Sequence, residues 1–167
     1  KKEVCVPRVL FICTGNIFRS MIAEYALKAQ VLHEVGLAVA SAGIQAKPME
    51  MYGVARDRLI ELGVDPTGHV QRRLTGEILE GAGLPVAMSV DHQAFVHETF
   101  DREVPLFNRV CYGRDEPLLD LGEKLPDWQA NTTEAETYVR QMVDRIWEAI
   151  PHFKANLTQF LPRSDGN

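Results

Sequence analysis

The sequence predicts an α/β fold in which a parallel β-sheet is covered by helices on both faces. Two patterns point to this fold: short runs of apolar, β-branched and aromatic residues alternate with longer segments whose apolar residues have helical spacing. Neither an internal repeat nor a low-complexity linker interrupts the alternation, and 167 residues are enough to bury one core. We therefore expect a single domain over residues 1–167, with any ligand at the carboxyl ends of the strands.

Four segments are predicted to be strands. The first run is apolar and rich in β-branched and aromatic side chains, which is typical of a buried strand. The second run ends at Gly43, and the third is entered through Gly83. Pro105 weakens the fourth assignment, because proline cannot donate a hydrogen bond to a β-ladder. The expected strands cover residues 8–12, 37–42, 84–88 and 104–110.

Helical spacing begins directly after the turn that follows the first strand. From Ser20 onward, Glu24 and Lys28 are predicted to lie away from an apolar face that consists of Ile22, Tyr25, Ala26 and Ala29. A later helix closes at Gly63, since glycine is the usual residue just after a helix end. The middle of the chain is predicted to be helical over residues 52–62, 75–80 and 92–100.

The last helix has the clearest start of all the predicted elements. Thr133 and Glu136 have the spacing of a capping box. Pro151 is expected to end or kink this helix, although Phe153 and Leu157 continue the helical spacing. Its apolar stripe consists of Val139, Met142, Val143, Ile146 and Ile150.

The most informative stretch is the octad Cys13-Thr14-Gly15-Asn16-Ile17-Phe18-Arg19-Ser20, which joins the first strand to the first helix. In such a turn the backbone N–H groups converge and the helix dipole adds positive charge, so the turn favours an anion. Gly15 permits a tight turn, and Asn16 tolerates left-handed dihedral angles. Arg19 offers a planar fork for two oxygens of a tetrahedral oxyanion, and with the helix N-terminus it stabilises a Cys13 thiolate. The alternative is a buried strand-end cysteine followed by a solvated arginine.

This Cys-x5-Arg-Ser loop with Gly-Asn inside it resembles the signature of the low-molecular-weight protein tyrosine phosphatases. The resemblance implies a four-stranded parallel sheet with helices on both faces. It also implies hydrolysis of phosphotyrosine through a cysteinyl-phosphate intermediate. The resemblance extends over nearly the whole chain, through Ala23-Glu24, Ser41-Ala42-Gly43, Gly63-Val64-Asp65 with His69, Leu125-Pro126-Asp127 and Glu136-Thr137.

The resemblance assigns roles to individual residues. Cys13 is expected to attack phosphorus, with Arg19 and the rest of the loop over residues 14–20 holding the phosphate. Asp127 is expected to protonate the leaving oxygen and later to activate the water, although its surroundings alone suggest a surface loop aspartate. Ser20 is expected to bond the thiolate, to cap the helix, or both. The residues that resemble the family's loop-supporting network are Asn16, Ser41 and His69; taken alone, the histidine is more often a satisfied loop residue.

A few residues depart from the family pattern. Phe18 stands where many members carry a second cysteine that traps an oxidised nucleophile as a disulfide. Met21 replaces the usual proline at the helix start. Trp128 replaces the proline that follows the acid, and it is expected either to offer a flat wall to a phenyl ring or to pack in the core. Gln129 and Ala130 replace tyrosines that line the family's cleft.

Composition disfavours several other classes of function. A net charge of −5 gives no general attraction for nucleic acid or an anionic membrane. Three cysteines at irregular spacing suit a reducing cytoplasm, with Cys5 and Cys111 as packing residues or incidental thiols. We find no apolar run of membrane-spanning length and no signal-peptide pattern at the first residues. No metal-ligand cluster or nucleotide loop appears, so neither a metal nor another cofactor is expected.

Three functions are compatible with the sequence. The leading one is a phosphatase for tyrosine-phosphorylated proteins or small aryl phosphates, because a recessed thiolate favours a long aryl phosphate over the short phosphoserine. An arsenate reductase uses the same loop on the same fold, but the segment over residues 87–94, where one class carries its cysteine pair, contains no cysteine. The third is a non-catalytic phosphate-binding regulatory module, which the intact Cys13, Arg19 and Asp127 argue against.

Overall fold

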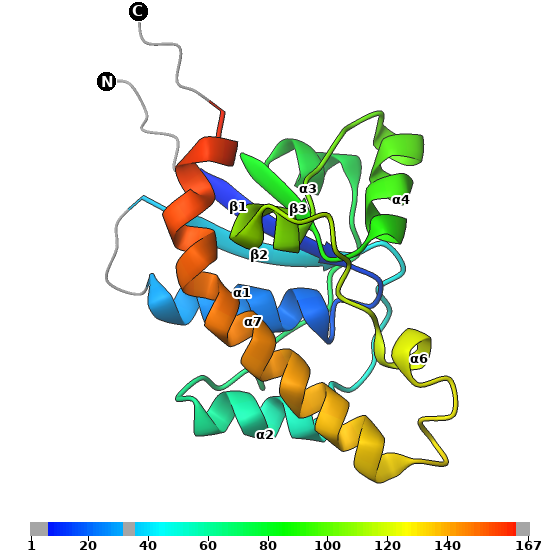
Figure 1. Ribbon diagram of the computed structural model, residues 1–167. Coiled ribbons are helices and arrows are strands. Elements are labelled where there is room, and N and C mark those ends of the chain that lie inside the picture. The colour runs from blue at the N-terminus through cyan, green and yellow to red at the C-terminus, as the bar shows by residue number, and fades with distance from the viewer. Residues whose placement is uncertain (1–6, 32–35, 163–167) are drawn as a thin grey trace, which may run out of the picture.

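The computed structural model describes residues 7–31 and 36–162, and it is an α/β structure built on a parallel sheet (Figure 1). Three strands pair in the order β2-β1-β3. They are β1 (Arg8–Cys13), β2 (Ala38–Gly43) and β3 (Leu84–Ala87). In the central strand, Cys13 pairs with Gly43 of β2. The carboxyl ends of the parallel strands thus meet at one edge of the sheet, with Cys13 in its middle.

Successive side chains of β1 enter two separate cores, because neighbouring residues of a strand point to opposite faces. Val9, Phe11 and Cys13 belong to the larger core, whereas Leu10 and Ile12 belong to the smaller one. The larger core also takes buried residues from α1 (Arg19–Gln30), α2 (Gly53–Glu61), α5 (Phe107–Tyr112) and α7 (Thr132–Phe160). The opposite face is covered by α3 (Gly76–Glu80) and α4 (Val90–Phe100) (Figure 1).

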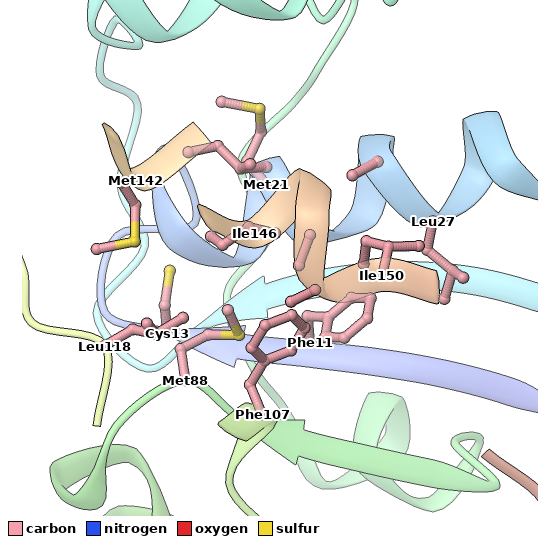
Figure 2. Close-up of a cluster of buried hydrophobic side chains, with 14 of the residues drawn as sticks. Phe11, Cys13, Met21, Leu27, Met88, Phe107, Leu118, Met142, Ile146 and Ile150 are labelled. Atoms are coloured by element: carbon pink, nitrogen blue, oxygen red, sulfur yellow. The ribbon is translucent and has the colours of Figure 1, made fainter. Parts of the chain in front are cut away.

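Aromatic rings anchor the central strand in the larger core. The Phe11 ring lies 6.0 Å from the Phe107 ring and 5.2 Å from the Phe153 ring, between centroids. Phe107 stacks on Phe153 at 5.8 Å. Figure 2 shows Cys13 at one end of this cluster, in the same buried core as Met88 and Met142. The packing fixes β1, and it therefore fixes where Cys13 stands.

Most predicted elements are confirmed to within two residues at each end. These are the first three strands, the helices α1 to α4, and the start of α7. Gly63 follows α2 with a φ of 90°, as expected for a residue that ends a helix. Thr75 precedes α3, and its side-chain oxygen accepts from the Ile78 N–H at 3.2 Å.

The predicted fourth strand over residues 104–110 is wrong. The chain forms an isolated bridge between Ala87 and Leu106, where the Ala87 N–H donates to the Pro105 carbonyl at 2.9 Å. Pro105 has no N–H with which to extend the ladder. The chain then turns into α5, whose helical spacing buries Phe107, Val110 and Cys111 in the larger core. The apolar residues of this segment therefore have the spacing of a short helix and not that of a strand.

The last helix does not end at Pro151, and its predicted capping box is wrong. α7 continues through the proline, and its N-cap residue Asn131 makes no side-chain capping bond. A proline deprives the carbonyl four residues earlier of its helical donor. Gln30 Nε2 supplies a replacement by donating to the Trp147 carbonyl at 3.4 Å. The predicted apolar stripe is confirmed, because all five of its residues are buried.

A second short helix escaped the sequence analysis. α6 spans Leu121–Lys124 and lies between α5 and α7 in the chain. Asp120 is its N-cap residue, and the Asp120 side chain accepts from the Leu121 N–H at 2.9 Å. Glu123 closes a capping box by accepting from the Asp120 N–H at 3.1 Å. Within the described part of the chain, no helix combines the length and apolar character needed to span a membrane.

Candidate active site

Cys13 lies at the floor of a small pocket at the carboxyl edge of the sheet. Its side chain is buried, with 2% of the residue exposed. The pocket has a volume of about 180 Å³, and the loop after β1 forms its base. Segments distant in the sequence supply its walls, which comprise Gln45, Lys47, Met49, Tyr52 and Asp120.

Asn16 is the centre of the hydrogen bonds that shape the loop. It is fully buried and has a φ of 58°, in the left-handed region that asparagine tolerates. Its Nδ2 donates to Ser20 Oγ at 3.0 Å and to Ser41 Oγ at 2.7 Å. Its Oδ1 accepts from the Arg72 N–H at 2.9 Å, and its carbonyl accepts from His69 Nε2 at 2.6 Å. The structure thus brings the predicted residues Asn16, Ser41 and His69 together around the loop.

The bonds made by Asn16 fix the direction of the neighbouring ones. Ser20 Oγ accepts from Asn16, and it lies 2.8 Å from Cys13 Sγ, so its own proton is available to the sulfur. Ser41 Oγ likewise accepts from Asn16, and it donates to Glu24 Oε1 at 2.5 Å. A hydroxyl donor at Cys13 stabilises the sulfur in its thiolate form.

Glu24 is a member of this network that the sequence analysis missed. It was predicted to point away from the apolar face of α1, but it is buried beneath β2, with 7% of the residue exposed. Its second carboxylate oxygen pairs with Lys28 one turn later on α1. A buried carboxylate requires partners, and Ser41 and Lys28 supply them. The one signal in the sequence was that Ala23-Glu24 resembles the family pattern, and this resemblance assigned no role to Glu24.

The loop over residues 14–18 packs closely on the end of β2. The Ile44 N–H donates to the Cys13 carbonyl, and the Gln45 N–H donates to the Thr14 carbonyl, both at 2.9 Å. A Cβ atom added at Gly43 would lie 2.5 Å from the Thr14 carbonyl oxygen and 2.9 Å from the Asn16 nitrogen. Gly43 is therefore required by the close approach of two backbone segments.

Arg19 lines the pocket and is almost fully buried, with 1% of the residue exposed. Its Nη1 donates to the Leu118 carbonyl at 2.7 Å, and its Nη2 lies 3.4 Å from Thr14 Oγ1. The carboxylates of Asp120 and Glu123 stand 3.9 and 3.8 Å away. Among residues 7–31 and 36–162, Arg19 Nε has no hydrogen-bond partner. A buried donor of this kind fits an anion at the pocket floor.

The structure brings Asp120 to the pocket rather than Asp127. Asp120 lines the pocket together with Cys13 and Arg19. Asp127 lies in an exposed turn seven residues later, where its carbonyl accepts from the Ala130 N–H. The signal that marks Asp120 in the sequence is its capping-box spacing to Glu123, which places a carboxylate at a helix start.

Trp128 does not line the pocket with Cys13 either. Tyr52 forms that wall, with its ring 5.2 Å from the Phe18 ring and 6.2 Å from the Trp128 ring, between centroids. Trp128 instead lines a neighbouring apolar hollow of about 210 Å³ that shares Tyr52 with the first pocket. Trp128 therefore contacts Tyr52, which lines the pocket, and does not itself line the pocket.

The second described thiol, Cys111, does not line the pocket with Cys13. Cys111 is buried on α5, and burial raises the pKa of its thiol to about 12. Cys5 lies outside the described residues. Within residues 7–31 and 36–162, no group of three or more histidine, cysteine or acidic side chains is arranged to hold a metal ion.

A family model described as low molecular weight phosphotyrosine protein phosphatase matches residues 8–158, which include the whole site. The chain belongs to this family. The chain is a phosphatase of the low molecular weight class, and its parallel sheet flanked by helices is the fold of that class. The resemblance read from the cysteine loop is thereby confirmed.

Relatives of this phosphatase carry two substrate names. A low molecular weight protein-tyrosine-phosphatase of Acinetobacter johnsonii is 34% identical over 97 residues, which cover 55% of this chain and 63% of the relative. A protein-arginine-phosphatase of Bacillus subtilis is 29% identical over 146 residues, 83% of this chain and 95% of the relative. The crystal structure of a YwlE mutant from Bacillus subtilis has a TM-score of 0.77 at 26% identity, covering 91% of this chain and 99% of that one. The matches thus divide between phosphotyrosine and phosphoarginine.

Proposed function

We propose that this phosphatase hydrolyses phosphotyrosine and other aryl phosphates through a cysteinyl-phosphate intermediate, with Asp120 as the general acid. One arrangement carries the proposal. Cys13, the Arg19 guanidinium with its unpartnered Nε, and the Asp120 carboxylate all face the same pocket. These are a nucleophile, an anion holder and a proton donor at one small site.

The first step transfers the phosphoryl group to sulfur. Cys13 Sγ attacks phosphorus while Arg19 and the loop N–H groups hold the oxygens that do not react. The bond between phosphorus and the phenolic oxygen breaks. Asp120, in its protonated form, gives its proton to that oxygen, so a neutral phenol departs.

The second step returns the enzyme to its starting state. A water attacks the phosphocysteine on the side that the phenol has left, and Asp120 takes its proton. The bond between sulfur and phosphorus breaks, and inorganic phosphate leaves. The Ser20 hydroxyl, 2.8 Å from Cys13 Sγ, stabilises the departing thiolate.

The pocket walls favour an aryl phosphate over phosphoarginine. Ile17, Phe18 and Tyr52 present apolar surface to the group that follows the phosphate. A guanidinium placed there would lose its hydration and would need acceptors. Among the described residues that line the pocket, Asp120 is the one carboxylate, and it already caps α6. Lys47 adds a like charge at the rim.

An arsenate reductase is disfavoured by the surroundings of Cys13. That chemistry passes the oxidation on to a further thiol. Cys111 is buried, and its pKa is raised to about 12, so it supplies little thiolate near neutral pH. Phe18, and not a second cysteine, occupies the loop position beside Arg19, so the loop itself offers no further thiol.

Steady-state kinetics on matched substrates tests the proposal. We expect kcat/KM for a phosphotyrosine peptide to exceed that for the same peptide with phosphoarginine by at least about tenfold, since Asp120 is the one carboxylate among the described pocket residues and it already caps α6. Arsenate with a thiol reductant should give no turnover. Cys13→Ser should abolish hydrolysis of both peptides while inorganic vanadate still binds. A preference for phosphoarginine would overturn the substrate, and residual activity of more than a few per cent in Cys13→Ser would overturn the mechanism.

A further inference from the structure

A buried histidine outside the pocket lining reaches the phosphate loop from the far side of the sheet. His92 lies on α4 and is fully buried, at 0% exposure. Its Nδ1 accepts from the Ser89 N–H at 3.1 Å. The neutral ring therefore carries its proton on Nε2, which lies 2.9 Å from Thr14 Oγ1. The bond runs from histidine to threonine, and it joins two segments that are 78 positions apart.

Thr14 receives a second donor from the other side. Arg19 Nη2 lies 3.4 Å from the same hydroxyl oxygen. A hydroxyl has two lone pairs and one proton, so two incoming bonds leave Thr14 with its proton to give away. Thr14 lines the pocket directly beside Cys13. A phosphate bound at the pocket floor would be an acceptor for this proton.

We infer that His92 is a positioning residue, which holds the Thr14 hydroxyl as a hydrogen-bond donor to the bound phosphate. The inference rests on the proposed function, because it deepens the account of the same anion site. His92 does not touch the substrate. It acts through Thr14. Because Nε2 of His92 donates to the Thr14 hydroxyl oxygen, the hydroxyl proton cannot turn toward the ring.

The charges around His92 keep the ring in the form that this role needs. Burial, followed by the positive charge of Arg19, lowers the pKa of His92 to about 4. The Asp91 carboxylate, 3.7 Å from Nε2 on the same helix, opposes this shift. The ring is therefore neutral above about pH 4, where Nδ1 accepts from Ser89. Protonation below that pH would place a hydrogen on Nδ1 against the Ser89 N–H.

Two substitutions separate the two bonds of the ring. The His92→Gln amide extends to where Nε2 stands, so it retains a donor for Thr14 and loses the acceptor for Ser89. The His92→Asn amide is shorter; it retains an acceptor near the Nδ1 position and loses the donor. The two variants have similar polarity, so each is a control for the other.

Binding of inorganic phosphate to Cys13→Ser protein, measured by calorimetry, tests the inference without turnover. In that background, His92→Asn should raise the dissociation constant about tenfold, the effect of one hydrogen bond to a charged group, and His92→Gln should stay within about threefold. Thr14→Val should raise it equally, and His92→Asn added to Thr14→Val should have no further effect. In the active enzyme the same changes should raise KM more than they lower kcat.

The outcomes distinguish this inference from the proposed function. If Cys13→Ser protein with native His92 and Thr14 bound no phosphate, the anion site itself would be wrong. If it bound phosphate and His92→Asn changed nothing, or weakened binding equally in the Thr14→Val background, the role of His92 would be refuted. If His92→Asn failed to fold, Thr14→Val against Thr14→Ser, which keeps the hydroxyl, would test the donor to phosphate. A loss of phosphate affinity well beyond threefold in His92→Gln would then refute the role of His92.

Discussion

Asp120 and Asp127 lie seven positions apart in different surroundings, and the proposed role of Asp120 as the acid depends on this difference. Asp120 lines the pocket and stands 3.9 Å from Arg19 Nη2, whereas Asp127 lies in an exposed turn. Asp120→Asn should lower kcat on phenyl phosphate about a hundredfold, because the phenoxide then departs unprotonated. The matched change Asp127→Asn should leave kcat within about twofold.

A series of substituted phenyl phosphates checks the role as well as the residue. The loss in Asp120→Asn should shrink as the leaving phenol becomes more acidic, since a more acidic phenol needs less protonation. A loss that stayed constant along the series would make Asp120 structural. A large loss in Asp127→Asn would return the acid to the later turn.

The sequence alone could place two candidate site residues together where both belong to one turn. Cys13 and Arg19 belong to one turn, so the sequence alone places them together. Asp120 belongs to the site through the path of the chain between α5 and α7, which contains α6, an element that was not predicted. The spacing of Leu125-Pro126-Asp127 and Glu136-Thr137 could not show whether Asp120 or Asp127 lines the pocket.

At the scale of elements, the contact between β2 and the loop over residues 14–18 leaves no room for a side chain at Gly43. Gly43→Ala should lower kcat/KM by at least about tenfold, because the Thr14 and Asn16 backbone atoms must move and a small misplacement of a catalytic loop is costly. Gly68→Ala is the control, since a Cβ there would meet nothing within 4 Å. Equal activity of the two variants would show that the loop over residues 14–18 can shift without loss of catalysis.

The passage of α7 through Pro151 gives a second test at this scale. Pro151→Ala restores an N–H for the Trp147 carbonyl, and it should raise the free energy of unfolding by about 1 kcal/mol, after the gain in freedom of the unfolded chain is deducted. Gln30→Ala should then cost less in the Pro151→Ala protein than in the original, because the carbonyl has another donor. Urea denaturation of the four proteins measures both effects. Equal costs in the two backgrounds would mean that Gln30 does not replace the donor that Pro151 lacks.

At the scale of the molecule, the alternation of strands and helices predicted the layers, but it did not predict the number of strands. Residues 104–110 contain apolar residues at positions that fit both periods. Contact with α7, which lies more than twenty residues later, selects the helix. Pro151 was predicted to end or kink the last helix for a local reason, but the helix continues, and a glutamine from α1 donates to the carbonyl that the proline leaves without its helical donor. Errors of both kinds arise where distant segments decide the local structure.

The distribution of thiols over the molecule predicts how it responds to peroxide. Cys13 lies at the floor of the pocket, where peroxide can reach its sulfur, and reversal of that oxidation requires a second thiol that captures the sulfenic acid. Phe18 stands beside Arg19, and Cys111 is buried with a raised pKa. Peroxide should therefore inactivate the enzyme with little intramolecular disulfide, and late addition of reductant should restore less activity than early addition. Mass spectrometry that found a dominant, reversible disulfide from Cys13 to Cys111 or Cys5 would contradict this.

The proposed nucleophile Cys13 and the proposed acid Asp120 lie on parts of the fold that we expect to differ in stability. Cys13 ends the middle strand of the sheet. Asp120 precedes the four-residue helix α6, in which residues 122–124 are exposed. Amide hydrogens of β1 should exchange with solvent only through global unfolding, while those of α6 should exchange through brief local opening. Bound vanadate should slow exchange in α6 and leave β1 unchanged. In the proposed mechanism, a rigid part of the fold would then hold the phosphoryl group, and a part that opens locally would deliver the proton and release the product.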